Sequence, residues 1–428
     1  MGRKGLSFGN QPVYSSRIPL GSRRFQAVLV SGLFWLNLFR PNPEIAPGVI
    51  AVFWLDAVYV GVALTLLMFA LIDGRHIKLG WVIFSLGMLL LALFPLVFGA
   101  IEYKITYSIR LIYVTVFLPI LFGVWFQAGS KVPTLYAKAL LFSAAPIGAI
   151  VFFQLMHFYP VTDWVHWLWG TDKLRSLQST SPRVYGSFYN ANWFGVYSVF
   201  LAVCAWGLFH IRQIGKLSFA LHLLLAVAFI VVSGSRTALI GLAVVVVSAL
   251  LVLGVQRGIR QFVRVTVGLF LGLVVILFSA GRFLDERFLK RWLELFSGEG
   301  VVSAAGRFAT WASSWSRVSE NPLGGGGVMG IPHNSYLATL EAFGLMFGGL
   351  VLGFYVALVG SSWLLAKRQE ATIVVPILMA FSVMAGTAEF FYTTQLMILV
   401  VPMLMWVVFS FAGGNAPRRG VDLKRRIC

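Results

Sequence analysis

Apolar runs of about 20 residues recur along almost the whole chain, and each is long enough to cross the hydrocarbon of a membrane as one helix. Hydrophobic residues make up 59% of the sequence and charged residues only 11%. In a soluble protein, charged residues make up about 25%. We therefore predict an all-α polytopic membrane protein in which a single helical bundle uses most of the 428 residues.

The apolar runs predict about twelve transmembrane helices and one large extracytoplasmic loop that contains amphipathic helices. We expect the spans at about 24–39, 47–72, 77–100, 106–127, 134–156, 192–213, 216–234, 236–254, 262–280, 335–364, 371–388 and 391–412. The chain then divides into a tail at 1–23, nine spans within 24–280, the large extracytoplasmic loop at 281–334, three spans within 335–412 and a tail at 413–428.

The distribution of Lys and Arg predicts the orientation, because these residues collect on the cytoplasmic side of a membrane. They are frequent in both tails and in every second loop, whereas the other short loops hold only Arg40, Lys104 and Arg236. Both termini are therefore expected in the cytoplasm. The same rule explains the net charge of +19 by contact with anionic headgroups of the lipid bilayer, so no nucleic acid is expected as a partner.

This orientation places three polar segments together on the outer face, at 157–191, 233–236 and 281–334. In the longest segment, apolar residues repeat at helical spacing over 283–296 and again over 304–319. We interpret these stretches as amphipathic helices that lie on the membrane surface.

His333 directly precedes the span at 335–364 and is the first candidate for chemistry. Histidine titrates near neutral pH without any perturbation and therefore suits a general base. On position alone, an interfacial histidine without a role is an equally good interpretation. Asn334 suits a helix cap. Glu341 is expected near the same helix face as His333, where it contacts either the site or a neighbouring helix.

Three arginines are candidates for binding an anion. Arg236 and Arg183 stand near the outer ends of spans, and a guanidinium binds phosphate with its planar fork. The alternative is that each side chain only extends its charge from the hydrocarbon edge to water. Arg110 lies about one turn inside the fourth span, which indicates either a functional group or a structural ion pair.

Other kinds of site are disfavoured. The sequence has no Asp-x-Asp, which weakens a metal-dependent sugar-nucleotide transferase. The four glycines at 324–327 are not followed by Lys-Ser or Lys-Thr, so they do not form a nucleotide-binding P-loop. Asp163 and His166 are two ligands at most, which is a weak metal signal. These observations disfavour metal-dependent and nucleotide-dependent chemistry.

Three patterns taken together resemble the O-antigen ligase and polymerase superfamily of bacterial envelope glycan assembly. The patterns are Arg-x-x-Gly-x-Phe-x-Asn-x-Asn at 183–192, Ser-Gly-Ser-Arg-Thr-Ala-Leu at 233–239, and Pro-His-Asn-Ser-Tyr-Leu at 332–337 followed by Gly344. Arg307, Trp311 and the Asn-Pro-Leu-Gly of 321–324 complete the third block. The similarity covers about 183–350, and the other spans match only in number and hydropathy.

Two positions depart from the ligase motifs. The histidine motif ends on Gly, Thr or Tyr, where this chain has Phe347, and the arginine motif has Leu where this chain has Ile240. These departures bear on the choice between ligase and polymerase and leave the resemblance to the superfamily intact.

The resemblance implies an enzyme, namely an O-antigen ligase of the bacterial inner membrane with its active site on the periplasmic face. Such a glycosyltransferase moves O-antigen polysaccharide from undecaprenyl diphosphate to lipid A-core, with inversion and without a metal or another cofactor. His333 would then be the general base or position the acceptor hydroxyl. Arg236 and Arg183 would hold the diphosphate, with help from Arg110. Asn334, Tyr336, Arg307 and Glu341 would support the site.

Several alternatives stay open at this point. An O-antigen or exopolysaccharide polymerase, or a protein O-oligosaccharyltransferase, would share the same motifs and differ only in the acceptor. A polytopic transporter of lipid-linked glycans also suits twelve spans, although transporters gather polar groups near the bilayer midplane and this chain gathers them at one face. A non-catalytic scaffold for glycan assembly is a third possibility.

Overall fold

The structure is a computed structural model of the chain. It describes residues 35, 61, 132–158, 160–161, 163, 183–188, 190–260, 263, 298–324, 334–387 and 394–412. Apart from isolated positions, the first four predicted spans and the span at 262–280 lie outside the described residues, as does the predicted helix at 283–296. The described part is all-helical and contains no strand, which agrees with the predicted class.

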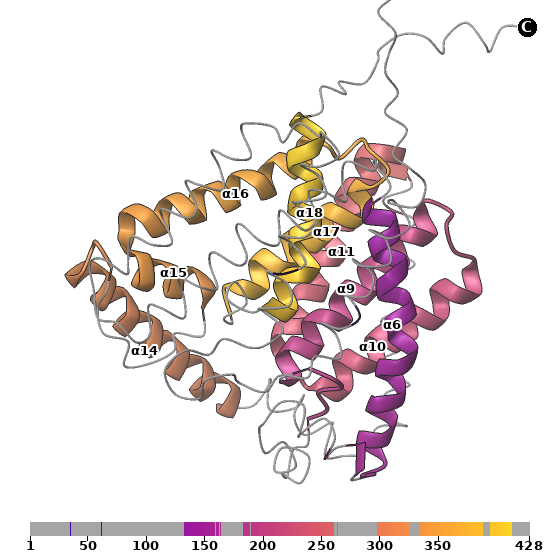
Figure 1. Cartoon of the computed structure of the whole chain (residues 1–428), viewed down its shortest axis with the longest axis horizontal. Coiled ribbons are helices and arrows are strands. Elements are labelled where there is room, and N and C mark those ends of the chain that lie inside the picture. The colour runs from indigo at the N-terminus through magenta and orange to yellow at the C-terminus, as the bar shows by residue number, and fades with distance from the viewer. Residues whose placement is uncertain are drawn as a thin grey trace, which may run out of the picture.

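Within the described part of the chain, six helices form a bundle (Figure 1). They are α6 (Val132–Leu155), α9 (Ala191–His210), α10 (Lys216–Ser233), α11 (Arg236–Arg257), α17 (Ala371–Ala385) and α18 (Thr394–Ala412). Each helix overlaps a predicted span, because an apolar run bounded by polar or turn residues fixes where a membrane helix begins and ends. The described residues include five helices that are long and apolar enough to cross a membrane, which indicates a membrane protein.

Helix α9 lies at the centre of the bundle and contacts α6, α10, α11, α17 and α18. Phe194, Phe200 and Val203 are fully buried on it. Gly195 allows α11 to approach closely, since a Cβ atom at this position would lie 2.7 Å from the Cβ of Ser235. Small residues at such contacts let helices pack tightly within a membrane, where no hydrophobic effect drives them together.

The remaining helices lie to one side of the bundle (Figure 1). They are α14 (Gly298–Glu320), α15 (Ser335–Phe343), the π-helical turn η2 (Gly344–Gly348) and α16 (Gly349–Leu364). Helix α16 contacts α17 and α18, and α14 contacts α15. Helix α16 therefore joins this group to the bundle, and the Tyr336 hydroxyl of α15 adds a hydrogen bond to the Ser382 carbonyl of α17.

Helix α14 is the helix expected at 304–319, and it begins earlier, at Gly298. Its described part is amphipathic: Phe308 and Trp315 are exposed, whereas Ser314 and Val318 are buried. The exposed aromatic residues suit contact with a membrane surface.

The span predicted at 335–364 coincides with a candidate membrane span, Ser335–Leu364, and the structure shows an interruption within it. Helix α15 ends at Gly344, which has a φ of +76°, and a π-helical turn follows before α16 begins. The backbone of 322–324 approaches this break, and the N–H of Leu345 donates to the carbonyl of Pro322 at 2.8 Å. The segment at 322–324 therefore satisfies a backbone donor that the interrupted helix leaves free.

Polar contacts define two opposite ends of the bundle. At one end, Asn192 and Ser235 are hydrogen-bonded where α9 and α11 begin. At the other end, His210 and Gln256 are in contact where the same two helices finish. Helices α9 and α11 therefore run parallel, and we call these the Asn192 end and the His210 end.

Candidate functional site

Arg183 joins two of the three sequence patterns at the Asn192 end. Its Nε donates to the carbonyl oxygen of Ser233 at 3.0 Å, and its Nη2 donates to Oδ1 of Asn192 at 2.7 Å. The hydroxyl of Ser235 donates to the same Asn192 oxygen at 3.2 Å. One amide oxygen thus links the segment at 183–192 to the turn at 233–236, and at least part of the role of Arg183 is to hold these segments together.

The turn at 233–236 is built for a sharp reversal between α10 and α11. Gly234 has a φ of +57° and ends α10 in the left-handed conformation, which glycine adopts without strain. Ser235 caps α11 by accepting from the N–H of Ala238. Arg236 is consequently the first residue of α11, where it is half-buried.

The position of Arg236 has an electrostatic consequence. The N-terminus of a helix carries a partial positive charge, so a cation there is repelled and an anion is attracted. An arginine in the first turn of α11 therefore adds to the positive potential and favours an anionic ligand, as helix N-termini in general do.

The third pattern begins at the same end of the bundle. Asn334 caps α15 by accepting from the N–H groups of Tyr336 and Leu337. The Tyr336 hydroxyl donates to the carbonyl of Ser382, near the end of α17, at 2.6 Å. The last turn of α17 reaches α11 through Thr387, whose hydroxyl lies 3.1 Å from that of Thr237.

These contacts bring the segments at 183–192, 233–239 and 334–337 to one end of the molecule. Helices α9, α11 and α15 all begin there, and each start is capped by a side-chain oxygen, from Asn190, Ser235 and Asn334 respectively. Three helix N-termini and two arginines therefore share this end, which suits the binding of an anion.

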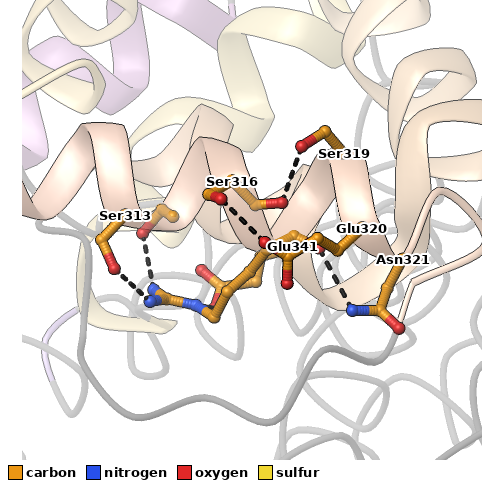
Figure 2. A network of polar contacts seen from close by, with 8 residues as sticks. Ser313, Ser316, Ser319, Glu320, Asn321 and Glu341 are labelled. Atoms are coloured by element: carbon orange, nitrogen blue, oxygen red, sulfur yellow. Dashed lines mark hydrogen bonds and ion pairs between the residues drawn. The ribbon is translucent and has the colours of Figure 1, made fainter.

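Glu341 forms an ion pair with a residue of α14 (Figure 2). Its Oε1 accepts from Arg317 Nε at 2.6 Å. The other guanidinium nitrogens of Arg317 donate to Ser313 and Ser314. Glu341 therefore contacts a neighbouring helix, as one of the two alternatives predicted, whereas its contact with the site stays a prediction because His333 lies outside the described residues. Its Oε2 is buried and has no hydrogen-bond partner among the residues that the structure describes.

The remaining predicted site residues are distributed as follows. Arg307 is half-buried on α14, ten residues before Arg317, which puts the two about 15 Å apart along the helix axis. His333 and Arg110 lie outside the described residues, so their roles stay predictions. Among the residues that the structure describes, no group of three or more His, Cys, Asp or Glu side chains is arranged to hold a metal ion.

Sequence reasoning missed several residues that assemble this region. Asn192 was part of a quoted pattern but was not singled out, and its place one residue into α9 is a signal that could have been used. Arg317 and Thr387 gave no such signal, because their partners Glu341 and Thr237 belong to distant parts of the chain.

Comparison of the sequence with known protein families found no family model that matches this chain. A search of curated proteins likewise found no match. The site is therefore interpreted from its own residues and geometry.

Proposed function

We propose that this protein is a membrane-embedded glycosyltransferase that moves O-antigen polysaccharide from undecaprenyl diphosphate to lipid A-core. One observation carries the proposal: the network of Arg183, Asn192 and Ser235 holds two arginine-bearing segments at the end of the bundle where α15 begins. The sequence puts His333 one residue before the cap of α15.

The positive charge at this end fits the leaving group of such a reaction. When the glycosidic bond breaks, undecaprenyl diphosphate departs as an anion, and fixed positive groups stabilise the charge that develops in the transition state. We assign Arg236 to this role, because it adds its charge to the N-terminus of α11. We assign Arg183 to shaping the site and to a secondary contact with the diphosphate, with Arg110 as a further helper.

The proposed reaction is a single displacement. The acceptor hydroxyl oxygen forms a bond to the anomeric carbon, and the bond from that carbon to the diphosphate oxygen breaks with inversion. The bonding electrons leave with the diphosphate, and the hydroxyl proton passes to His333 as general base. No metal and no other cofactor takes part in this scheme.

The proposed setting is a bacterial inner membrane with about twelve spans, both termini in the cytoplasm and the Asn192 end in the periplasm. The positive-inside rule supports this orientation, because Arg212, Lys216, Arg257 and Lys367 all belong to the segments around the His210 end. The segment at 281–334 would then be the periplasmic loop, with α14 at the membrane surface.

The test is a transfer assay with purified protein, a polyprenyl-diphosphate-linked glycan and rough lipopolysaccharide, in the presence of a chelator. We expect high-molecular-weight lipopolysaccharide from the wild type and none from His333→Ala. His157→Ala is the matched control, since His157 is an exposed histidine following α6. Normal transfer by His333→Ala would refute the general-base role, and loss of transfer in chelator with rescue by a divalent ion would refute the metal-free scheme.

Enzymes with the same transfer chemistry differ in the acceptor, so the product of the assay distinguishes the alternatives. Longer lipid-linked glycans without modified lipopolysaccharide would identify a polymerase of O-antigen or exopolysaccharide. Glycan on a protein substrate would identify a protein O-oligosaccharyltransferase.

One observation favours a function of a different class. Transporters often carry interrupted helices whose free backbone groups bind a substrate near the bilayer midplane, and the span at 335–364 is interrupted at Gly344. Here a backbone donor at the interruption already has a partner within the protein, because the N–H of Leu345 donates to the carbonyl of Pro322. For this reason we rank a transporter of lipid-linked glycans second. Transport of the lipid-linked glycan by reconstituted protein that forms no new glycosidic bond would reverse the ranking.

A further inference from the structure

A cavity of about 400 Å³ lies at the His210 end, opposite to the candidate site. It forms where α9 ends at His210, where α11 ends at Arg257 and just beyond the end of α16 at Leu364. All three helices belong to candidate membrane spans. The cavity therefore lies at the level where spans leave the hydrocarbon, which is the level of lipid headgroups.

The walls of this cavity are held by hydrogen bonds from one side chain. Gln256 Nε2 donates to the carbonyl oxygens of Ala366 and Arg368, at 2.9 Å and 2.8 Å. Gln256 Oε1 lies 3.1 Å from Nε2 of His210. These bonds join the ends of α9 and α11 to the turn after α16, so the cavity is a fixed feature of the fold and not a gap between independent helices.

Two cations face this cavity without a matching anion among the described residues that line it. Arg257 and Lys367 both line it and are exposed. Of the described residues that line the cavity, none is acidic, and none of the described carboxylates forms an ion pair with either cation. Arg368, the next residue along, is directed elsewhere: it donates to Ser410, and its guanidinium lies 6.0 Å from the ring centroid of Trp406.

Exposed apolar surface adjoins these cations. Val255 lines the cavity and is 52% exposed, and Ile259 and Leu364 are 74% and 76% exposed. Leu251, one turn before Val255 on α11, is also exposed. A ligand that satisfies this whole region needs a negative group for the cavity and hydrocarbon for the adjoining surface. Basic pockets between membrane helices bind anionic lipid headgroups in this way.

We infer that this cavity binds the phosphate headgroup of an anionic phospholipid, with Arg257 and Lys367 contacting the phosphate and the acyl chains lying along Val255 and Leu251. The site is separate from the candidate transfer site, because it lies at the opposite end of the same helices. Its existence does not depend on the proposed function.

The test compares lipids on the full-length purified protein. Binding of dioleoylphosphatidylglycerol and of dioleoylphosphatidylcholine would be measured by native mass spectrometry from detergent. We expect the anionic lipid to bind about tenfold more tightly than the zwitterionic lipid, as two basic residues near a headgroup imply. Equal affinity of the wild type for both lipids would overturn the inference without reference to any variant.

The double variant Arg257→Gln/Lys367→Gln should lose this preference. The matched control is Lys216→Gln/Arg260→Gln, which removes the same charges from exposed residues that do not line the cavity. A charge-conserving variant, Arg257→Lys/Lys367→Arg, should keep most of the preference and shows whether the altered cavity still folds. Retention of the preference by the Gln variant, or its equal loss in the control, would contradict the site.

Inorganic phosphate distinguishes a lipid headgroup from a free anion. At 10 to 100 times the lipid concentration (about 1–10 mM), phosphate should compete only weakly, because it lacks the hydrocarbon that adds binding free energy through buried CH₂ groups. Full displacement of phosphatidylglycerol by phosphate in this range would overturn the lipid assignment and leave an anion site.

Discussion

Arg317 Nε lies 2.6 Å from Oε1 of Glu341, so a charged hydrogen bond joins helix α14 to helix α15. The side chain of Glu341 is 3% exposed and that of Arg317 is 18% exposed. A carboxylate so deeply buried is costly unless a cation and hydrogen bonds accompany it. The pair therefore fixes where α14 lies relative to the start of the interrupted span.

Removing the cation from this pair should destabilise the protein more than removing both charges. Arg317→Met leaves the Glu341 carboxylate buried without its partner, and we expect a loss of about 3 kcal/mol in the free energy of unfolding. Arg317→Met/Glu341→Gln should recover a large part of that loss. Unfolding in SDS mixed micelles measures the free energy of unfolding of the single and the double variant. Arg307→Met on the same helix is the control. Equal losses for the single and double variants would contradict the coupling.

Gly344 should not tolerate a side chain. A Cβ atom there would collide with the backbone of Pro322 and Leu323, and the φ of +76° is strained for any other residue. We expect Gly344→Ala to reduce the free energy of unfolding by about 2–4 kcal/mol. Gly353→Ala is the control, because nothing lies within 4 Å of its Cβ position and alanine favours a helix. If both variants have the same stability, the backbone of 322–324 does not lie against Gly344 as the structure has it.

Asn192 should stabilise the protein through its side-chain amide oxygen. Asn192→Ala removes the acceptor shared by Arg183 and Ser235, and we expect a loss of about 1–3 kcal/mol in stability. Asn192→Asp keeps an acceptor and should preserve most of the stability. Asn321→Ala, at an exposed asparagine that donates to the Arg317 carbonyl, should change stability by less than about 0.5 kcal/mol. A larger loss in Asn192→Asp than in Asn192→Ala would argue against the shared-acceptor role.

Arg236→Lys tests whether the guanidinium acts on the donor in the proposed transfer. Lysine keeps the charge but lacks the planar fork that binds phosphate oxygens in pairs. We expect transfer to fall at least about tenfold, which corresponds to about 1.4 kcal/mol of transition-state stabilisation, while the protein stays folded. Arg212→Lys, at the His210 end, serves as the control. Full activity of Arg236→Lys would mean that the side chain only extends its charge to water.

The helices of the bundle could be predicted from the sequence because each apolar run is bounded by residues that end a helix. Ser233, Gly234 and Ser235 separate two such runs, and the structure changes helix at this turn. The gathering of the described motifs at one end follows from the alternation of spans, which sequence alone can count. The described spans begin and end within a few residues of the predicted positions.

The interruption at Gly344 could not be predicted in this way. A glycine within an apolar run is compatible with a continuous helix, and its positive φ is explained only by the backbone of 322–324 that lies against it. Likewise, the spacing of Glu341 from His333 indicated a shared helix face but not the partner. Arg317 lies 24 residues earlier on another helix, and only the tertiary arrangement brings the two together.

The polar bonds at the two ends of α9 and α11 restrict how these helices can move. At one end, Asn192 is hydrogen-bonded to Ser235. At the other end, the His210 side chain contacts Gln256, and the His210 carbonyl accepts from the Arg257 guanidinium. Sliding one helix past the other by a single turn, about 5.4 Å, would break the contacts at both ends simultaneously. These bonds consequently hold α9 and α11 in one register at both ends. Any conformational change that preserves these bonds moves α9 and α11 together.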